Sequence, residues 1–170
     1  MNQRPDQNDP NQISEPALHR LVLEQSVGSG ASWFYWIGAL SLINSILGYT
    51  NMTVSFPVGL GVTQLVDAVA LTAKSTTASI LAASIDAIIA GIFCAFGYFS
   101  RTMNWLFILG MALYALDAAI LGVVTSMIGK FDWMSVGFHV FALYCIFRGY
   151  QSSRELNAVK HLGSGTNRPD

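Results

Sequence analysis

The chain has 170 residues, of which 52% are hydrophobic and only 11% are charged, and its formal net charge is −1. Soluble domains carry about 25% charged residues, so this composition indicates a protein embedded in a membrane. The small net charge gives no electrostatic basis for binding nucleic acid or a strongly acidic substrate.

Residues 1–31 are expected to form a polar N-terminal tail. Residues 1–15 are rich in Asn, Gln, Asp and Pro, a composition typical of disorder. Residues 16–27 carry apolar side chains at helical spacing, which predicts either a short amphipathic helix at the membrane interface or a loosely ordered leader. The sequence Gly28-Ser-Gly30 is expected to end this helix.

The first predicted membrane span covers residues 32–50. It opens with the aromatic sequence Trp33-Phe-Tyr-Trp36, which suits the headgroup region of a bilayer. Further along, Ser41, Asn44 and Ser45 are polar side chains that can form hydrogen bonds to neighbouring helices.

Residues 58–75 form an amphipathic segment whose relation to the membrane is ambiguous. Its start is rich in Pro and Gly, and beyond it Gln64, Asp67 and Lys74 share one helical face opposite an apolar face. The segment can be a fifth span, a re-entrant segment, or a helix lying at the interface. Asp67 is expected to be solvated there.

Three further spans are predicted at residues 78–99, 104–128 and 133–149, followed by a polar C-terminal tail over 151–170. The connection between the second and third spans is short, so they are expected to be antiparallel neighbours. Small residues recur at every fourth position of the second span, and we expect them to let the third span approach closely. These residues are Ser79, Ala83, Ala87, Gly91 and Ala95.

The distribution of positive charge favours four spans over five. With four spans and both termini cytoplasmic, the inner residues are Arg4, Arg20, Arg101, Arg148, Arg154, Lys160 and Arg168, against Lys74 and Lys130 outside. With five spans and the C-terminus inside, Arg4 and Arg20 would join the two lysines outside. The sequence therefore predicts a multi-pass protein of the plasma or inner membrane with both termini in the cytoplasm.

Each predicted span carries one strongly polar residue in the outer half of the membrane: Asn44, Asp86, Asp117 and His139. At 1.5 Å per residue they lie about 9 to 16 Å from the outer ends of their helices. A carboxylate inside a span costs about 2.5 to 3.5 kcal/mol on insertion scales, so it is expected to have a partner or a function. These four residues are the predicted polar layer, with Gln64 and Asp67 as secondary candidates.

The predicted layer suits three kinds of chemistry. It could relay protons, because a carboxylate and an imidazole can both change charge near neutral pH in an apolar environment. It could hydrogen-bond a substrate entering from outside. It could also bind a divalent metal through Asp86, Asp117 and His139, and a divalent metal is the one cofactor that these residues would suit. The structural alternative is that the layer only holds the helices together.

No motif of a known catalytic type is present in the sequence, which favours a function other than catalysis. The predicted fold is an all-α membrane bundle of four spans with an interfacial or re-entrant helix between the first two. The leading hypothesis is a small transporter-like or ion- or proton-coupled protein. The alternatives are a non-catalytic accessory or membrane-organising subunit, and an intramembrane metal-dependent hydrolase. Four helices enclose little volume, so a homo-oligomer or a partner membrane protein is expected.

Overall fold

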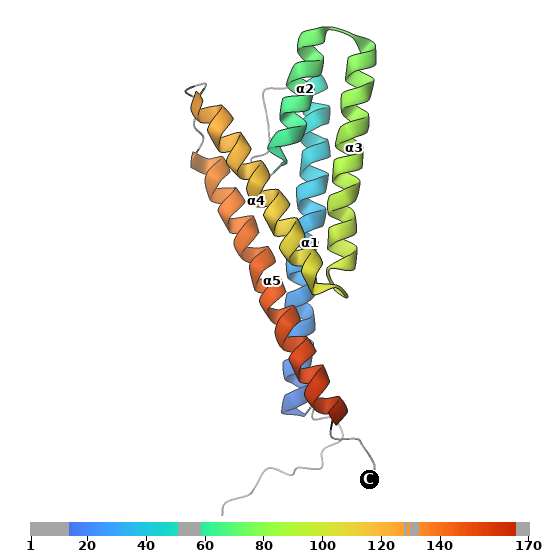
Figure 1. Cartoon of the computed structure of the whole chain (residues 1–170), viewed down its shortest axis with the longest axis vertical. Coiled ribbons are helices and arrows are strands. Elements are labelled where there is room, and N and C mark those ends of the chain that lie inside the picture. Colours follow the sequence, from blue (N-terminus) through green and yellow to red (C-terminus); the bar gives the residue numbers. More distant parts are fainter. Residues whose placement is uncertain (1–13, 51–58, 128, 130–132, 166–170) are drawn as a thin grey trace, which may run out of the picture.

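A computed structural model of the chain describes residues 14–50, 59–127, 129 and 133–165, with side chains as far as Lys160. These residues contain five α-helices (Figure 1): α1 (Glu15–Tyr49), α2 (Gly61–Ala73), α3 (Thr76–Phe99), α4 (Asn104–Met127) and α5 (Trp133–Gly165). The all-helical prediction is confirmed, and α2 matches the predicted amphipathic segment. The predicted disorder of residues 1–13 lies outside the described residues.

Helix α1 is one continuous helix of 35 residues, about 52 Å long at 1.5 Å per residue. The predicted break at Gly28-Ser-Gly30 is therefore wrong. The reason is a close crossing with α5, where a Cβ atom added to Gly30 would lie only 2.5 Å from the Cα atom of Gly149. The two backbones touch at this point, and this packing offsets the low helix propensity of glycine.

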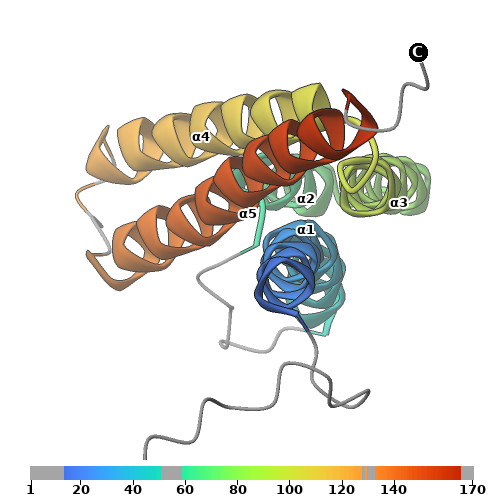
Figure 2. The same cartoon turned by 90° about the horizontal axis from the view of Figure 1, so that it is seen from below.

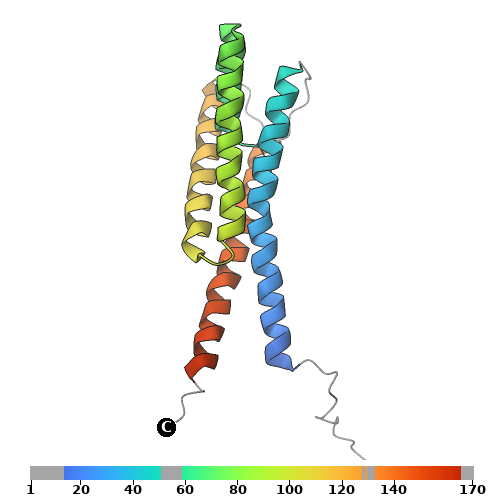
Figure 3. The same cartoon turned by 90° about the vertical axis from the view of Figure 1, so that its right-hand side faces the viewer.

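Helices α1 and α5 form the central pair of the bundle, and α2 packs on α1, α3 and α4. Helices α1 and α5 run antiparallel and make the most extensive contact, α3 packs mainly on α1, and α4 packs mainly on α5. The view along the bundle shows α2 lying between α1, α3 and α4 (Figure 2). At the other end, the start of α1 and the end of α5 project together beyond the turn that joins α3 to α4 (Figure 3). We call residues 15–27 of α1 and 153–165 of α5 the α1–α5 extension.

The small residues of α3 do not face α4, contrary to the expectation from their spacing. Ala83, Ala87, Gly91 and Ala95 are exposed, and a Cβ atom on Gly91 would meet nothing within 4 Å. The buried face of α3 lies about a quarter turn away and packs on α1, where the backbone of Ala90 approaches Gly38. Spacing alone identifies a small-residue stripe but not the neighbour that it meets.

Aromatic side chains form the apolar core. Phe34 of α1 has Phe93, Phe96 and Phe107 as ring neighbours at centroid distances of 5.9 to 6.3 Å. Phe34 and Phe107 are fully buried. A Cβ atom on Gly110 would lie 2.5 Å from the Phe34 ring, so this ring can pack against the backbone of α4 only because the position is glycine.

Beside this apolar core the bundle buries several ionisable side chains, and it exposes many large apolar ones. Trp36, Ile88 and Val123 are 60%, 64% and 60% exposed, whereas Asp86, Asp117 and His139 are 1%, 6% and 4% exposed. Among the described helices, α3 and α4 are long and apolar enough to cross a membrane, with mean hydropathy of 2.1 and 2.2 over 18 residues. The described residues thus form five helices, two of which could span a membrane.

Candidate functional site

The start of α2 lies inside the bundle and is held by side chains from two other helices. The backbone N–H groups of Gly61 and Val62 donate hydrogen bonds of 2.8 Å to the two carboxylate oxygens of Asp117 in α4. The N–H group of Leu60 donates to Ser41 Oγ of α1 at 2.7 Å. The first N–H groups of any helix lack partners within the helix, and they carry partial positive charge. Asp117 therefore acts as the cap of a helix to which it does not belong.

Two further polar side chains lie around this cap. A Cβ atom on Gly59 would collide with the Asn44 amide, so the chain enters α2 directly against that side chain. His139 of α5 is close enough to Asp117 for electrostatic interaction. We call Ser41, Asn44, Asp117 and His139 the Asp117 cluster.

The contacts of His139 define which ring nitrogen carries the proton in the neutral form. His139 Nδ1 lies 2.8 Å from the backbone carbonyl of Ser135, which can only accept, so Nδ1 donates. The ring stacks on Tyr114 with centroids 5.1 Å apart and planes 15° apart. His139 Nε2 is left buried without a hydrogen-bond partner among the described residues. The side chain is thus fixed in position, with one nitrogen unused.

A second cluster lies on the other side of α2, where α1, α2 and α3 meet. Ser45 Oγ donates a hydrogen bond of 2.8 Å to Asp86 Oδ2, and the Tyr49 hydroxyl donates one of 2.8 Å to Asp67 Oδ1. The carboxylates of Asp67 and Asp86 are close enough to interact electrostatically. Asp86 Oδ1 is buried with no hydrogen-bond donor among the described residues. We call Ser45, Tyr49, Asp67 and Asp86 the Asp86 cluster.

The four residues of the predicted layer are thus divided between two clusters. Asn44, Asp117 and His139 gather around the start of α2, whereas Asp86 pairs with Asp67. The prediction that Asp67 would be solvated is wrong, because this side chain is only 6% exposed. The polar face of α2 is directed toward α1 and α3, since Asp67 on this face accepts a hydrogen bond from Tyr49 of α1 and interacts with Asp86 of α3. Gln64, the other secondary candidate, is half-buried on α2.

The predicted metal ligands do not form one group. Among the described residues, no set of three or more His, Cys, Asp or Glu side chains is close enough to hold a metal ion. Asp86 is joined to α1 and α2, whereas Asp117 and His139 belong to the other cluster. The geometry gives the Asp86–Asp117–His139 metal site no support.

Tyr49 is the member of the Asp86 cluster that the sequence did not single out. It lies four residues after Ser45, so both hydroxyls share one face of α1. Two hydroxyl side chains at this spacing, near the end of a predicted span, could have identified Tyr49 as a candidate from the sequence. Its significance depends on the partner carboxylate, which comes from α2.

Comparison with known proteins gives no match: no family model fits the chain, and neither a curated protein nor a solved structure is similar to it. The geometry of the two clusters is therefore the basis on which a function can be inferred.

Proposed function

We propose that the chain is a four-span, ion- or proton-coupled membrane protein in which the Asp67–Asp86 pair binds one proton or one small cation. The observation that carries this proposal is the proximity of two buried carboxylates, Asp67 and Asp86, which bond to hydroxyls one turn apart on α1. One of them, Asp86, has an oxygen with no hydrogen-bond donor among the described residues. The Asp117 cluster has a different role: it anchors α2.

The membrane topology is supported by the distribution of polar and apolar side chains. A bundle with carboxylates and imidazole inside and large apolar groups outside is suited to lipid, because water would favour the reverse arrangement. The first half of α5 and the second half of α1 lie beside α3 and α4, so four helices present apolar side chains outward. These halves are the first and fourth spans of the proposed topology.

A contact between the start of α1 and the end of α5 supports four membrane crossings over five. His19 of α1 lies 3.1 Å from Glu155 of α5, so the start of α1 and the end of α5 occupy the same end of the bundle. Helix α2 has 13 residues, about 20 Å, and begins inside the bundle. In this topology α2 is therefore a re-entrant helix. The chain enters the membrane before α2 and leaves it after α2 on the same side, which is the side where Lys74 lies.

Electrostatics explains why the Asp67–Asp86 pair requires a positive charge. Two adjacent carboxylates in an apolar environment cannot both remain ionised, because their repulsion adds to the free-energy cost of burial. Within the described residues, the one salt bridge joins His19 and Glu155, so no Lys or Arg neutralises the pair. A proton shared between the carboxylates, or a monovalent cation bound by them, supplies the missing charge. The hydroxyls of Ser45 and Tyr49 hold the two carboxylates in place.

The proposal can be tested without knowing a transported solute. Dicyclohexylcarbodiimide enters apolar sites and forms a stable adduct with a protonated carboxyl group, which intact-protein mass spectrometry detects. We expect one adduct on the purified protein, with labelling that decreases as the pH is raised. Asp86→Asn, Asp67→Asn and the double substitution should strongly reduce labelling. Protection by sodium or lithium ions identifies a cation site, and the absence of protection identifies a proton site.

Glu24→Gln is the matched control, because Glu24 is an exposed carboxylate on α1 whose loss should leave labelling unchanged. Size-exclusion chromatography of each variant establishes that the fold is retained. Labelling of the double variant at the wild-type rate would show that the reactive carboxyl group lies elsewhere, and the proposal would fail.

A second candidate function is a non-catalytic accessory or membrane-organising subunit. It is favoured by the apolar side chains that the α1–α5 extension presents outside the bundle: Leu18, Leu21 and Val22 are 51% to 56% exposed. This function predicts that Leu18→Glu and Val22→Glu abolish association. The loss would appear as absent self-association in cross-linking or light scattering, or as failure of a partner subunit to co-purify. Asp67→Asn and Asp86→Asn would then leave the biological activity intact, whereas ion coupling predicts its loss.

A further inference from the structure

A groove of about 410 Å³ lies between α1 and α5, away from both carboxylate clusters. Gln25, Ser26 and Ser29 line it from α1, and Tyr144 and Arg148 line it from α5. Gly30 also lines the groove, and its lack of a side chain leaves the groove open beside the point where the two backbones cross.

The lining of the groove is suited to an anion. Arg148 supplies the one formal charge, and the hydroxyl and amide groups around it can donate hydrogen bonds. None of the described residues that line the groove is acidic. A guanidinium group with hydroxyl neighbours is a typical arrangement for binding phosphate.

The position of the groove along the bundle identifies the source of that phosphate in the proposed topology. Ser153, five residues after Arg148, donates a hydrogen bond to Asn104, the first residue of α4. Arg148 therefore lies near the level where α3 and α4 turn, which is the cytoplasmic boundary of the membrane. Tyr144, one helical turn before Arg148, lies on the side that faces the acyl chains.

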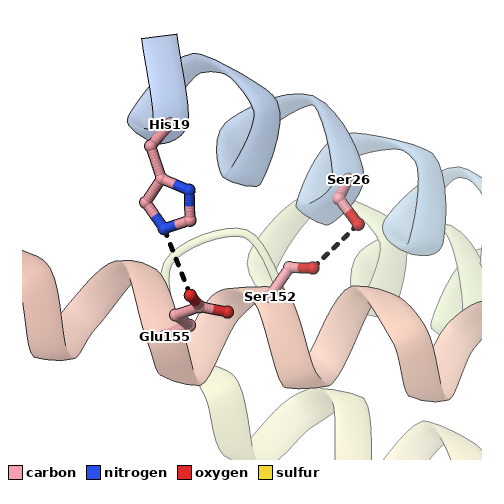
Figure 4. Close-up of polar contacts among 4 residues, drawn as sticks. All are labelled: His19, Ser26, Ser152 and Glu155. Atoms are coloured by element: carbon pink, nitrogen blue, oxygen red, sulfur yellow. Dashed lines mark hydrogen bonds and ion pairs between the residues drawn. The ribbon is translucent and has the colours of Figure 1, made fainter. Parts of the chain in front are cut away.

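Contacts at one end of the groove and beyond it hold its two walls together. Ser152 Oγ donates to Ser26 Oγ at 2.8 Å, and His19 Nε2 lies 3.1 Å from Glu155 Oε1 (Figure 4). The Gly30–Gly149 crossing holds the walls on the membrane side. A groove fixed at both ends loses little conformational entropy when a ligand binds.

We propose that this groove binds the headgroup of an anionic phospholipid of the cytoplasmic leaflet, with Arg148 contacting the phosphate. The inference rests on the four-span topology of the proposed function. It is independent of the ion bound by Asp67 and Asp86, because the groove shares no residue with that pair.

The test uses the full chain purified in detergent and titrated with phosphatidylglycerol or phosphatidylcholine. Native mass spectrometry counts the bound lipids, and thermal unfolding reports stabilisation. We expect phosphatidylglycerol to bind preferentially and to raise the unfolding midpoint. Arg148→Gln should weaken this binding by about tenfold, the effect of losing a charged hydrogen bond, and Arg148→Lys should weaken it less.

Arg154→Gln is the matched control, because Arg154 is an exposed arginine on the same helix that lies outside the groove. Ser29→Leu provides a second probe, since it fills the groove without removing charge. Equal lipid binding by the wild type, Arg148→Gln and Ser29→Leu would overturn the proposal.

Inorganic phosphate and glycerol 3-phosphate serve as water-soluble probes. If either binds as tightly as phosphatidylglycerol, the ligand is a free phosphate and the lipid assignment is wrong. Recovery of the chain in the soluble fraction without detergent would overturn the membrane topology and the lipid site together. An integral membrane protein whose lipid binding is unaffected by Arg148→Gln would overturn the lipid site alone.

Discussion

Asp117 shows how a carboxylate can lie inside the bundle with no Lys or Arg paired to it among the described residues. Its two oxygens accept the N–H groups of Gly61 and Val62, so the partial positive charge at the start of α2 compensates the carboxylate. In turn, α2 can begin in an apolar environment, where an N–H group without a partner costs several kcal/mol. The two features depend on one another.

Substitution of Asp117 tests this dependence. Asp117→Ala leaves two buried N–H groups without acceptors, and we expect it to lower the free energy of unfolding by about 2 to 5 kcal/mol. Asp117→Asn keeps one acceptor oxygen and should cost less. Denaturation of purified protein in mixed micelles measures both values. If Asp117→Ala were as stable as the wild type, the cap would have no energetic importance.

Sequence reasoning located the polar residues but did not pair them. Each lies on a predicted helix, and the cost of burying a carboxylate singled out Asp86 and Asp117. Asp117 accepts hydrogen bonds from the start of α2, whereas Asp86 accepts one from Ser45 of α1 and lies near Asp67 of α2. These pairings depend on long-range contacts such as the one between Gly61 and Asp117, which are 56 residues apart. For the same reason the solvated position expected for Asp67 was wrong: an amphipathic helix shows a polar face, but not whether water or another carboxylate covers it.

At the scale of helices, α1 and α5 form the central pair, and glycine determines how closely they approach. The backbones touch at Gly30 and Gly149, so neither position has room for a side chain. Close approach through small residues is a common mode of helix packing in membranes. Here it occurs between the first and last helices of the chain, which the sequence spacing did not indicate.

Alanine at the crossing should force α1 and α5 apart. A Cβ atom on Gly149 would lie 2.7 Å from the Gly30 Cα atom, so we expect Gly30→Ala or Gly149→Ala to lower the free energy of unfolding by about 1 to 3 kcal/mol. Gly91→Ala is the control, because that position is open and alanine is the better helix former. Chemical denaturation compares the three. Equal stability of all three variants would contradict the backbone contact.

Hydropathy predicted the helices well because apolar length is a local property. The bounds of α2, α3 and α4 lie within three residues of the predicted segments at 58–75, 78–99 and 104–128. The two long helices were not predicted as continuous elements: the start of α1 was expected as a separate short helix or a loose leader over 16–27, and the last predicted span ends at 149. Those ends are helical because α1 and α5 pack on each other, burying Leu23, Val27 and Leu156, and no local pattern reveals that contact.

At the scale of the whole molecule, the proposed topology places the termini, the α3–α4 turn and the α1–α5 extension on one side of the membrane. Lys74, at the turn between α2 and α3, lies on the other side. Positive residues on the first side include Arg101, Arg148 and Arg154, which agrees with the tendency of cytoplasmic loops to carry positive charge.

Cysteine labelling tests this arrangement. In a variant carrying Cys94→Ala and Cys145→Ala, single substitutions Lys74→Cys, Thr102→Cys and Glu24→Cys place a thiol at an exposed position. We expect an impermeant maleimide to label Lys74→Cys on intact cells, and the other two only after permeabilisation. Opposite behaviour of Glu24→Cys and Thr102→Cys would indicate five crossings.

The cap on α2 has a consequence for biogenesis. The acceptor for the first N–H groups of α2 is encoded 56 residues downstream, so it does not exist when α2 leaves the ribosome. In the proposed topology α2 must remain at the membrane surface, with those groups bound to water, until α4 has entered the bilayer. Helix α2 thus docks after α4, although it is synthesised before α3 and α4.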